Sequence, residues 1–258
     1  MQIGPFPVPR YTTLLHLGLL TGAVLIYLES RRRDLPLMPV ADVALAAGVG
    51  SVLLGRAMHV GMHWGYYQTH IAEAMLPWHG GLAWQGALLG GVTAGRLACA
   101  VRGLPLMPML DLLALGAAPV AVFAWLGCHT AGCAYGMETY PGQGMLWRLS
   151  LDLPDLYGIR EPRVPVQLLG AGWSALLLLL VGVLTVGRRS RRQGVTFALW
   201  LLLQGLGAFG LGFWRGDSVP QIGGWRVDQL ANLLLIGGAV VVGAVAMLKR
   251  DGSRARRT

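Results

Sequence analysis

Residues 127–136, GCHTAGCAYG, place two thiols beside one imidazole. Cys128 and Cys133 can form a disulfide, which an oxidising exterior favours. One of them can instead act as a thiolate nucleophile, with His129 as its base. A third interpretation treats both cysteines as small apolar side chains packed in a turn. The sequence leaves these three alternatives open and makes Cys128, His129 and Cys133 candidate catalytic residues.

The same segment contains three glycines directly after a long apolar stretch. Glycine permits tight turns and a close approach of the backbone to a ligand. We therefore count all three among the candidate substrate-binding residues: Gly127, Gly132 and Gly136.

Four histidines lie within 21 residues, from His59 to His79. His59 and His63 are four residues apart, which on a helix places both imidazoles on one face, as in many metal sites. A metal site normally needs three protein ligands, and only Glu73, near His70, lies at a suitable spacing to help. Histidine, tyrosine and tryptophan also gather at membrane interfaces. We therefore predict an interfacial cluster and no metal site.

Two arginines are notable for the apolar residues around them. Arg56 lies inside an apolar stretch, where a charge is costly unless it faces a partner or a wet cavity. Arg215 directly follows another apolar stretch, in the sequence GFWRGD at residues 212–217. A guanidinium can bind a lipid phosphate through paired hydrogen bonds, although an arginine at a helix end can also simply extend into water. Both arginines are candidate binding residues.

The composition indicates that membrane-spanning helices position these residues. The chain has 258 residues, of which 54% are hydrophobic and 13% are charged, and its mean hydropathy is +0.55. A soluble domain carries about 25% charged residues because water must solvate its surface, so a soluble enzyme is excluded. The net charge of +9 lies in short clusters between apolar stretches, a pattern that indicates membrane topology rather than binding of nucleic acid.

Seven apolar stretches are long enough to cross a bilayer, whose core of roughly 30 Å requires about 20 residues per helix. We therefore predict an all-α bundle of about seven transmembrane helices that forms a single domain over residues 1–258. The predicted spans are Thr12–Leu28, Val40–Val60, Gly81–Val101, Leu106–Leu126, Pro165–Val186, Val195–Trp214 and Gln229–Leu248.

Lysine and arginine are unevenly distributed between the two sets of loops. Thirteen of the 21 fall on one side, six on the other and two within predicted spans. Because cytoplasmic loops carry the excess, we predict an outer N-terminus and a cytoplasmic C-terminus with a basic tail at residues 249–258. The long segments 59–80 and 127–164, which hold five of the six histidines, then lie on the outer face.

The order of the motifs along nearly the whole chain resembles the prolipoprotein diacylglyceryl transferases. Residues 80–90, GGLAWQGALLG, are similar to the family's GGMSFHGGLIG. Residues 127–136 are similar to part of its signature, GRIGNFINGELWG, and residues 162–168, PRVPVQL, to its PRHPSQL. Residues 205–217 resemble its closing arginine block.

The resemblance implies transfer of a diacylglyceryl group from phosphatidylglycerol to the thiol of a lipobox cysteine, with release of glycerol phosphate. It implies that Arg215 and Arg56, which match family arginines, hold the phosphate, and it adds Arg163 as a binding residue. The expected partners are phosphatidylglycerol, a prolipoprotein lipobox and the membrane, without nucleic acid or a cofactor. The expected location is the bacterial cytoplasmic (inner) membrane.

Several positions differ from the family pattern. The main expectation is a transferase with a rebuilt site, in which His129 serves as base and Gln85 orients a substrate. The alternatives are a thiol-dependent transferase or redox pair that uses Cys128 and Cys133, and a non-enzymatic lipid-binding or assembly subunit. The departures are Gln85 at the family's histidine, Cys128 at its asparagine, Cys133 at its glutamate, and Trp125 and Ala208 at two of its arginines.

Overall fold

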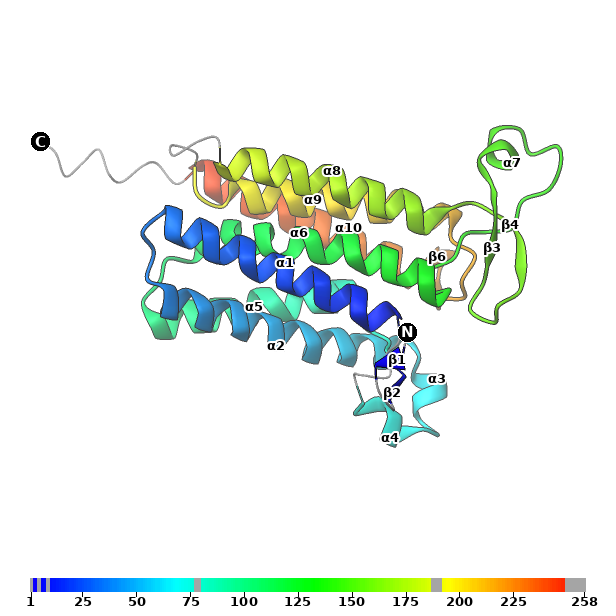
Figure 1. Ribbon diagram of the computed structural model, residues 1–258, viewed down its shortest axis with the longest axis horizontal. Coiled ribbons are helices and arrows are strands. Elements are labelled where there is room, and N and C mark those ends of the chain that lie inside the picture. Colours follow the sequence, from blue (N-terminus) through cyan, green and yellow to red (C-terminus); the bar gives the residue numbers. More distant parts are fainter. Residues whose placement is uncertain (1, 4–5, 8–9, 77–79, 187–191, 249–258) are drawn as a thin grey trace, which may run out of the picture.

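A bundle of long helices that run side by side dominates the computed structural model, which describes residues 2–3, 6–7, 10–76, 80–186 and 192–248 (Figure 1). Two features of the sequence analysis, His79 and the basic tail 249–258, lie outside these ranges. The long helices are α1 (Arg10–Arg32), α2 (Leu37–Met62), α5 (Trp84–Arg102), α6 (Leu106–Ala131), α8 (Val166–Val186), α9 (Val195–Leu211) and α10 (Val227–Leu248).

Within the described part of the chain, six of these helices are long and apolar enough to cross a membrane: α1, α2, α6, α8, α9 and α10. This confirms the prediction of an all-α, multi-pass membrane protein. Helix α5 has 19 residues, lies alongside α2 (Figure 1) and occupies the predicted span 81–101. The count of seven spans and the direction of insertion remain predictions.

Helices α2 and α5 approach each other closely because glycines face one another. A Cβ atom on Gly50 would collide with the carbonyl oxygen of Gly90, and one on Gly90 would collide with that of Gly50. Small residues of this kind let membrane helices pack at short distance. The contact fixes α5, which carries Gln85 near its N-terminus, against α2, which carries Arg56.

Helix α6 contacts α1, α5, α8 and α9 and contributes much of the buried core, which contains Met109 of α6 and Leu201 of α9. The buried carboxylate of Asp111 accepts hydrogen bonds from the backbone N–H groups of Gly194, at 2.7 Å, and Phe197, at 2.8 Å. It therefore caps the N-terminus of α9 from a neighbouring helix. The opposite end of α9 leads into Arg215.

The short elements near the candidate site gather at one end of the bundle, the loop-rich end (Figure 1). The predicted outer segments 59–80 and 127–164 contribute described residues to this end. The elements are α3 (Trp64–Tyr67), α4 (Ile71–Ala74), α7 (Met145–Leu149), the antiparallel pair β3 (Leu151–Pro154) and β4 (Arg160–Arg163), η2 (Gly212–Trp214), and the antiparallel pair β5 (Gln221–Ile222) and β6 (Trp225–Arg226). Near the N-terminus, β1 (Gln2–Ile3) pairs with β2 (Phe6–Pro7).

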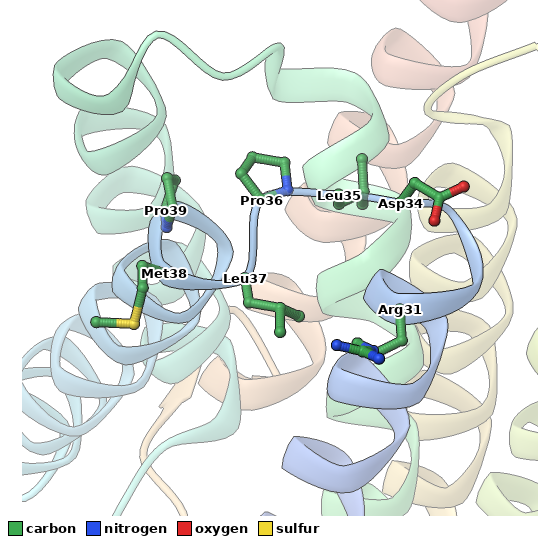
Figure 2. Close-up of a pocket in the computed structure, with 7 residues that line it drawn as sticks. All are labelled: Arg31, Asp34, Leu35, Pro36, Leu37, Met38 and Pro39. Atoms are coloured by element: carbon green, nitrogen blue, oxygen red, sulfur yellow. The ribbon is translucent and has the colours of Figure 1, made fainter.

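A cavity lies at the other end of the bundle, at the turn between α1 and α2 (Figure 2). Seven residues line it, among them Arg31 of α1 and Leu37 of α2. None of the predicted site residues belongs to this lining, so the cavity is not part of the candidate site.

Candidate active site

Arg215 lies at the loop-rich end, where η2 finishes α9 and the backbone becomes extended. Its Nε donates to Oδ1 of Asp217 at 2.8 Å, and its Nη2 also pairs with that carboxylate. Its Nη1 lies 3.0 Å from Oδ2 of Asp228, near the start of α10. Arg215 thus bridges a residue that follows α9 and a residue that begins α10.

A second arginine contacts the same two carboxylates. Arg226, on β6, places Nη2 3.2 Å from Oδ1 of Asp217 and Nε 3.1 Å from Oδ1 of Asp228. The β5–β6 turn brings Arg226 back toward Asp217, whose backbone oxygen accepts a bond from its Nη1 at 2.9 Å. We call Arg215, Asp217, Arg226 and Asp228 the four-charge network.

Asp217 is held in its ionised form. Its burial alone would raise its pKa, but the hydrogen bond and charge of Arg215, followed by those of Arg226, outweigh burial and lower the pKa below the usual 3.8. The network pairs two arginines with two aspartates, so its formal charges balance. A phosphate that reaches either guanidinium must therefore compete with a carboxylate.

Gln85 joins this network from α5. Its Nε2 donates to Oδ1 of Asn232, at 2.9 Å, and to the backbone oxygen of Asp228, at 3.1 Å. Both Gln85 and Asn232 are buried. The structure therefore brings together two residues that the sequence analysis selected, Gln85 and Arg215, with Asp228 between them.

Cys128 and Cys133 form a disulfide, so the first of the three interpretations describes this structure. Regular helix would point the two side chains apart, but Gly132 ends α6 in the left-handed conformation, with φ of 71°. This turn brings the two Cα atoms to 4.7 Å, within the usual range for a disulfide. His129 lies on the last turn of α6, half-buried, and its ring makes no hydrogen bond among the described residues.

The segment after the disulfide pairs with the Arg215 segment. The N–H of Met137 donates to the carbonyl of Trp214 at 2.8 Å, and the N–H of Gly216 donates to the carbonyl of Tyr135 at 2.9 Å. Gly136 therefore lies opposite Arg215 in a two-stranded bridge. The disulfide loop and the four-charge network are thus adjacent parts of one site.

Arg163, at the end of β4, belongs to a separate ion-pair cluster. Its Nη2 lies 2.9 Å from Oε1 of Glu138 and 3.4 Å from Oδ2 of Asp155, and its guanidinium lies over the ring of Tyr135, 5.0 Å from the ring centre. Burial, followed by the charge of Asp155, raises the pKa of Tyr135. Because its side chain is only 3% exposed, Arg163 serves the hairpin in this structure.

Arg56 is enclosed by backbone carbonyls. Its Nε donates to Ala74 at 3.0 Å, its Nη1 to Gly81 at 3.1 Å and to Gly80, and its Nη2 to Glu73 at 2.5 Å. The guanidinium also lies 5.1 Å from the centre of the Tyr67 ring. Arg56 therefore fastens the connection between α2 and α5, and it makes no direct contact with the four-charge network.

The remaining predicted residues lie near helix ends. Gly127 faces Tyr11 of α1, where a Cβ atom would meet the Tyr11 ring at 2.8 Å. The rings of His59 and His63 lie 4.3 Å apart. The described residues contain no group of three possible metal ligands.

Sequence reasoning missed Asp217, Arg226 and Asp228. A local signal for them exists, because the sequences Trp-Arg-Gly-Asp at 214–217 and Trp-Arg-Val-Asp at 225–228 repeat one pattern. Each places an arginine two residues before an aspartate, and in the structure the two pairs combine. The repeat was therefore the available clue to the four-charge network.

The helices and this site define a multi-pass membrane protein with a largely buried, charged centre at the loop-rich end of its bundle. A sequence model of the prolipoprotein diacylglyceryl transferases matches residues 1–245. The chain belongs to this family.

Relatives named phosphatidylglycerol–prolipoprotein diacylglyceryl transferase align over nearly the whole chain. The relative from Rhodospirillum rubrum is 31% identical, and the alignment covers 95% of this chain and 90% of the relative. The one from Synechococcus elongatus is 30% identical, with 93% and 84% covered. The one from Geobacillus kaustophilus is 28% identical, with 92% and 87% covered.

Proposed function

We propose that this protein transfers a diacylglyceryl group from phosphatidylglycerol to the lipobox cysteine of a prolipoprotein, in the bacterial inner membrane. The observation that carries the proposal is the contact between Arg215, retained from the family's closing block, and Gln85, at the family's histidine position, through Asp228. Both substrates come from the names of the relatives.

The reaction requires a thiolate and a stabilised leaving group. The thiol gives its proton to a base, and the sulfur forms a bond to the terminal carbon of the diacylglyceryl group. The bond from that carbon to the phosphate oxygen breaks, and its electron pair leaves with glycerol phosphate. Catalysis therefore depends on positive charge at the phosphate and on a proton acceptor near the sulfur.

In this proposal, Arg215 binds the phosphate by exchanging a carboxylate for a phosphate oxygen. Arg226 retains the displaced carboxylate, because it contacts both Asp217 and Asp228. Arg56 contributes charge, and Gln85 orients a substrate through its amide. Gly136 keeps the backbone close beside Arg215, and Gly132 makes the turn that leads into this strand. Gly127 and Arg163 support the two ends of that segment.

His129 is the proposed base. The amide of Gln85 cannot take a proton, and the disulfide leaves no free thiol at Cys128 or Cys133. His129 is directly next to Cys128, and no hydrogen bond within the described residues occupies its ring. A thiol-dependent mechanism at Cys128 or Cys133 would first require reduction of the disulfide.

A second candidate function is that of a lipid-binding or assembly subunit without catalysis. The observation that favours it is the balance of charge in the four-charge network, which is complete without an anion. The two candidates differ in whether product forms.

The test uses the purified protein in nanodiscs with phosphatidylglycerol and a synthetic lipobox peptide. We expect release of glycerol phosphate and a peptide whose mass has increased by one diacylglyceryl group. Arg215→Ala should lower both signals about 100-fold or more, whereas Arg148→Ala, which removes an exposed arginine on α7, should leave them unchanged. A lack of product from the wild-type protein, while an active relative works in the same discs, would favour the second candidate.

A further inference from the structure

The disulfide loop, residues 128–133, contacts three neighbours: Gln167 of α8, the backbone beside the Arg163 cluster, and the strand that pairs with the Arg215 segment. Cys128 lies on the last turn of α6, and the carbonyl of Cys133 accepts a hydrogen bond from Nε2 of Gln167, on the first turn of α8, at 2.9 Å. Gln167 is 2% exposed, and its Oε1 has no partner among the described residues. The hydrogen bond to Cys133 is therefore the one that fixes the side-chain amide of Gln167 among the described residues.

The loop also packs against the Arg163 cluster. A Cβ atom on Gly132 would collide with the backbone oxygen of Asp155, whose carboxylate pairs with Arg163 and accepts the N–H groups of Tyr157 and Ile159 at 2.8 and 2.9 Å. The left-handed turn at Gly132 thus has to keep its shape for the β3–β4 hairpin to pack as it does.

Only Ala134 separates the disulfide from the strand that pairs with the Arg215 segment. The two hydrogen bonds of that pairing, from Met137 and from Gly216, flank Arg215 on both sides. Ala134 has a positive φ of 51°, which is unfavourable for a residue with a Cβ atom. The disulfide at Cys133 therefore restricts the backbone of Ala134, the residue at which the chain turns into the strand.

Both cysteines of the pair are accessible, unlike the third cysteine. Cys128 and Cys133 are half-buried rather than fully enclosed, so the disulfide is open to a small thiol. Cys99, on α5, is 2% exposed in the core. Cys99 is already a free thiol, so among the three cysteines a reductant changes only the Cys128–Cys133 pair.

We infer that the Cys128–Cys133 disulfide is a redox-sensitive positioning element for Arg215, and this inference rests on the proposed transfer reaction. In the oxidised protein, the closed loop holds the Tyr135–Met137 strand against Trp214–Gly216. Two thiols of a reductant open the loop, giving Cys128 and Cys133 as free thiols and the reductant as its own disulfide. The strand pairing on both sides of Arg215 then loosens, the guanidinium is held less firmly against Asp217 and Asp228, and transfer slows.

The first readout does not depend on catalysis. The wild-type protein in nanodiscs is treated with dithiothreitol, alkylation and mass spectrometry verify the reduction, and hydrogen exchange is measured on peptides that contain Met137 and Gly216. We expect exchange at both amides to increase about tenfold, while the amide of Ala83, which donates to Gly55 beside Arg56, is unchanged. Unchanged exchange at Met137 and Gly216 after complete reduction would overturn the inference, even if the protein shows no transferase activity.

The second readout is kinetic. Reduction should lower kcat about tenfold, because a misplaced group next to the reacting atoms costs rate, with a smaller change in KM for phosphatidylglycerol, and reoxidation should restore kcat. The double variant Cys128→Ser/Cys133→Ser should have the rate of the reduced protein and should not respond to dithiothreitol. The matched control, Cys99→Ala, should respond like the wild-type protein. A double variant with the wild-type kcat, or one that dithiothreitol still slows, would contradict the inference.

Discussion

Arg56 and Arg215 are both largely buried near the loop-rich end, but different partners hold them. Four backbone carbonyls surround Arg56, and none of the described carboxylates pairs with it. Two carboxylates pair with Arg215 and share a second arginine with it. A backbone carbonyl accepts a hydrogen bond from a guanidinium but leaves its positive charge unbalanced. A carboxylate accepts the hydrogen bond and also balances the charge.

This difference in partners suits Arg56 to stabilising the fold and Arg215 to binding an anion. The guanidinium of Arg56 has used four of its five N–H groups but keeps its full positive charge, so it attracts an anion without offering it many bonds. Arg215 can exchange its partners, because Arg226 keeps both aspartates paired when Arg215 turns to a ligand. The comparison assigns Arg56 mainly to stability and Arg215 mainly to catalysis.

The largest expected effect is on stability, from Arg56→Ala. Four half-buried carbonyls would lose their donor. At about 1 kcal/mol for each group, the low end of the cost of an unsatisfied polar group, we expect a loss of about 4 kcal/mol. Arg56→Lys should recover little, because an ammonium cannot reproduce the planar fork. Thermal unfolding in detergent measures the effect, with Arg148→Ala as the control. A melting temperature of Arg56→Ala within two degrees of that of the control would remove the basis of the comparison.

Arg215→Ala should have the opposite profile. Arg226 remains to pair with Asp217 and Asp228, so the melting temperature should change much less than in Arg56→Ala. The transfer rate should fall about 100-fold or more, by the usual effect of removing one group that stabilises a developing anion. Single-turnover release of glycerol phosphate measures this effect. Equal losses of stability and rate in the two variants would show that the arginines do not differ in role.

The sequence predicted the long apolar helices and selected Arg215 and Gln85, two residues that the structure brings close to Asp228. Long apolar stretches have few structures available in a bilayer, which is why six spans appear where hydropathy predicts them. The contact of Gln85 with Asn232, 147 residues away, depends on how α5 and α10 pack and has no local signature. The disulfide stayed one of three alternatives because it depends on the left-handed turn at Gly132, which spacing alone does not reveal.

Arg226→Ala should have an intermediate effect. It leaves two carboxylates beside one guanidinium, so the network carries a net negative charge that repels the phosphate of the lipid. We expect KM for phosphatidylglycerol to rise about tenfold, corresponding to roughly 1.4 kcal/mol, with a smaller change in kcat. Steady-state kinetics at several lipid densities separates the two constants. Arg160→Ala, which removes an exposed ion pair with Asp152, is the control, and an unchanged KM in Arg226→Ala would restrict Arg226 to a structural role.

The smallest effect concerns the pH dependence of stability through Asp217. Its pKa in the folded protein lies below the usual 3.8, because Arg215 and Arg226 outweigh its burial. A lowered pKa stabilises the folded protein fully above about pH 3.8, and this contribution is lost as the pH falls through the lower, folded value. Asp217→Asn should therefore melt below the wild-type temperature at pH 7, and the difference should shrink as the pH approaches 3. Asp152→Asn, in an exposed ion pair, should show little difference at either pH. A gap for Asp217→Asn that stays constant from pH 7 to pH 3 would mean that the charge of Asp217 does not hold the two arginines together.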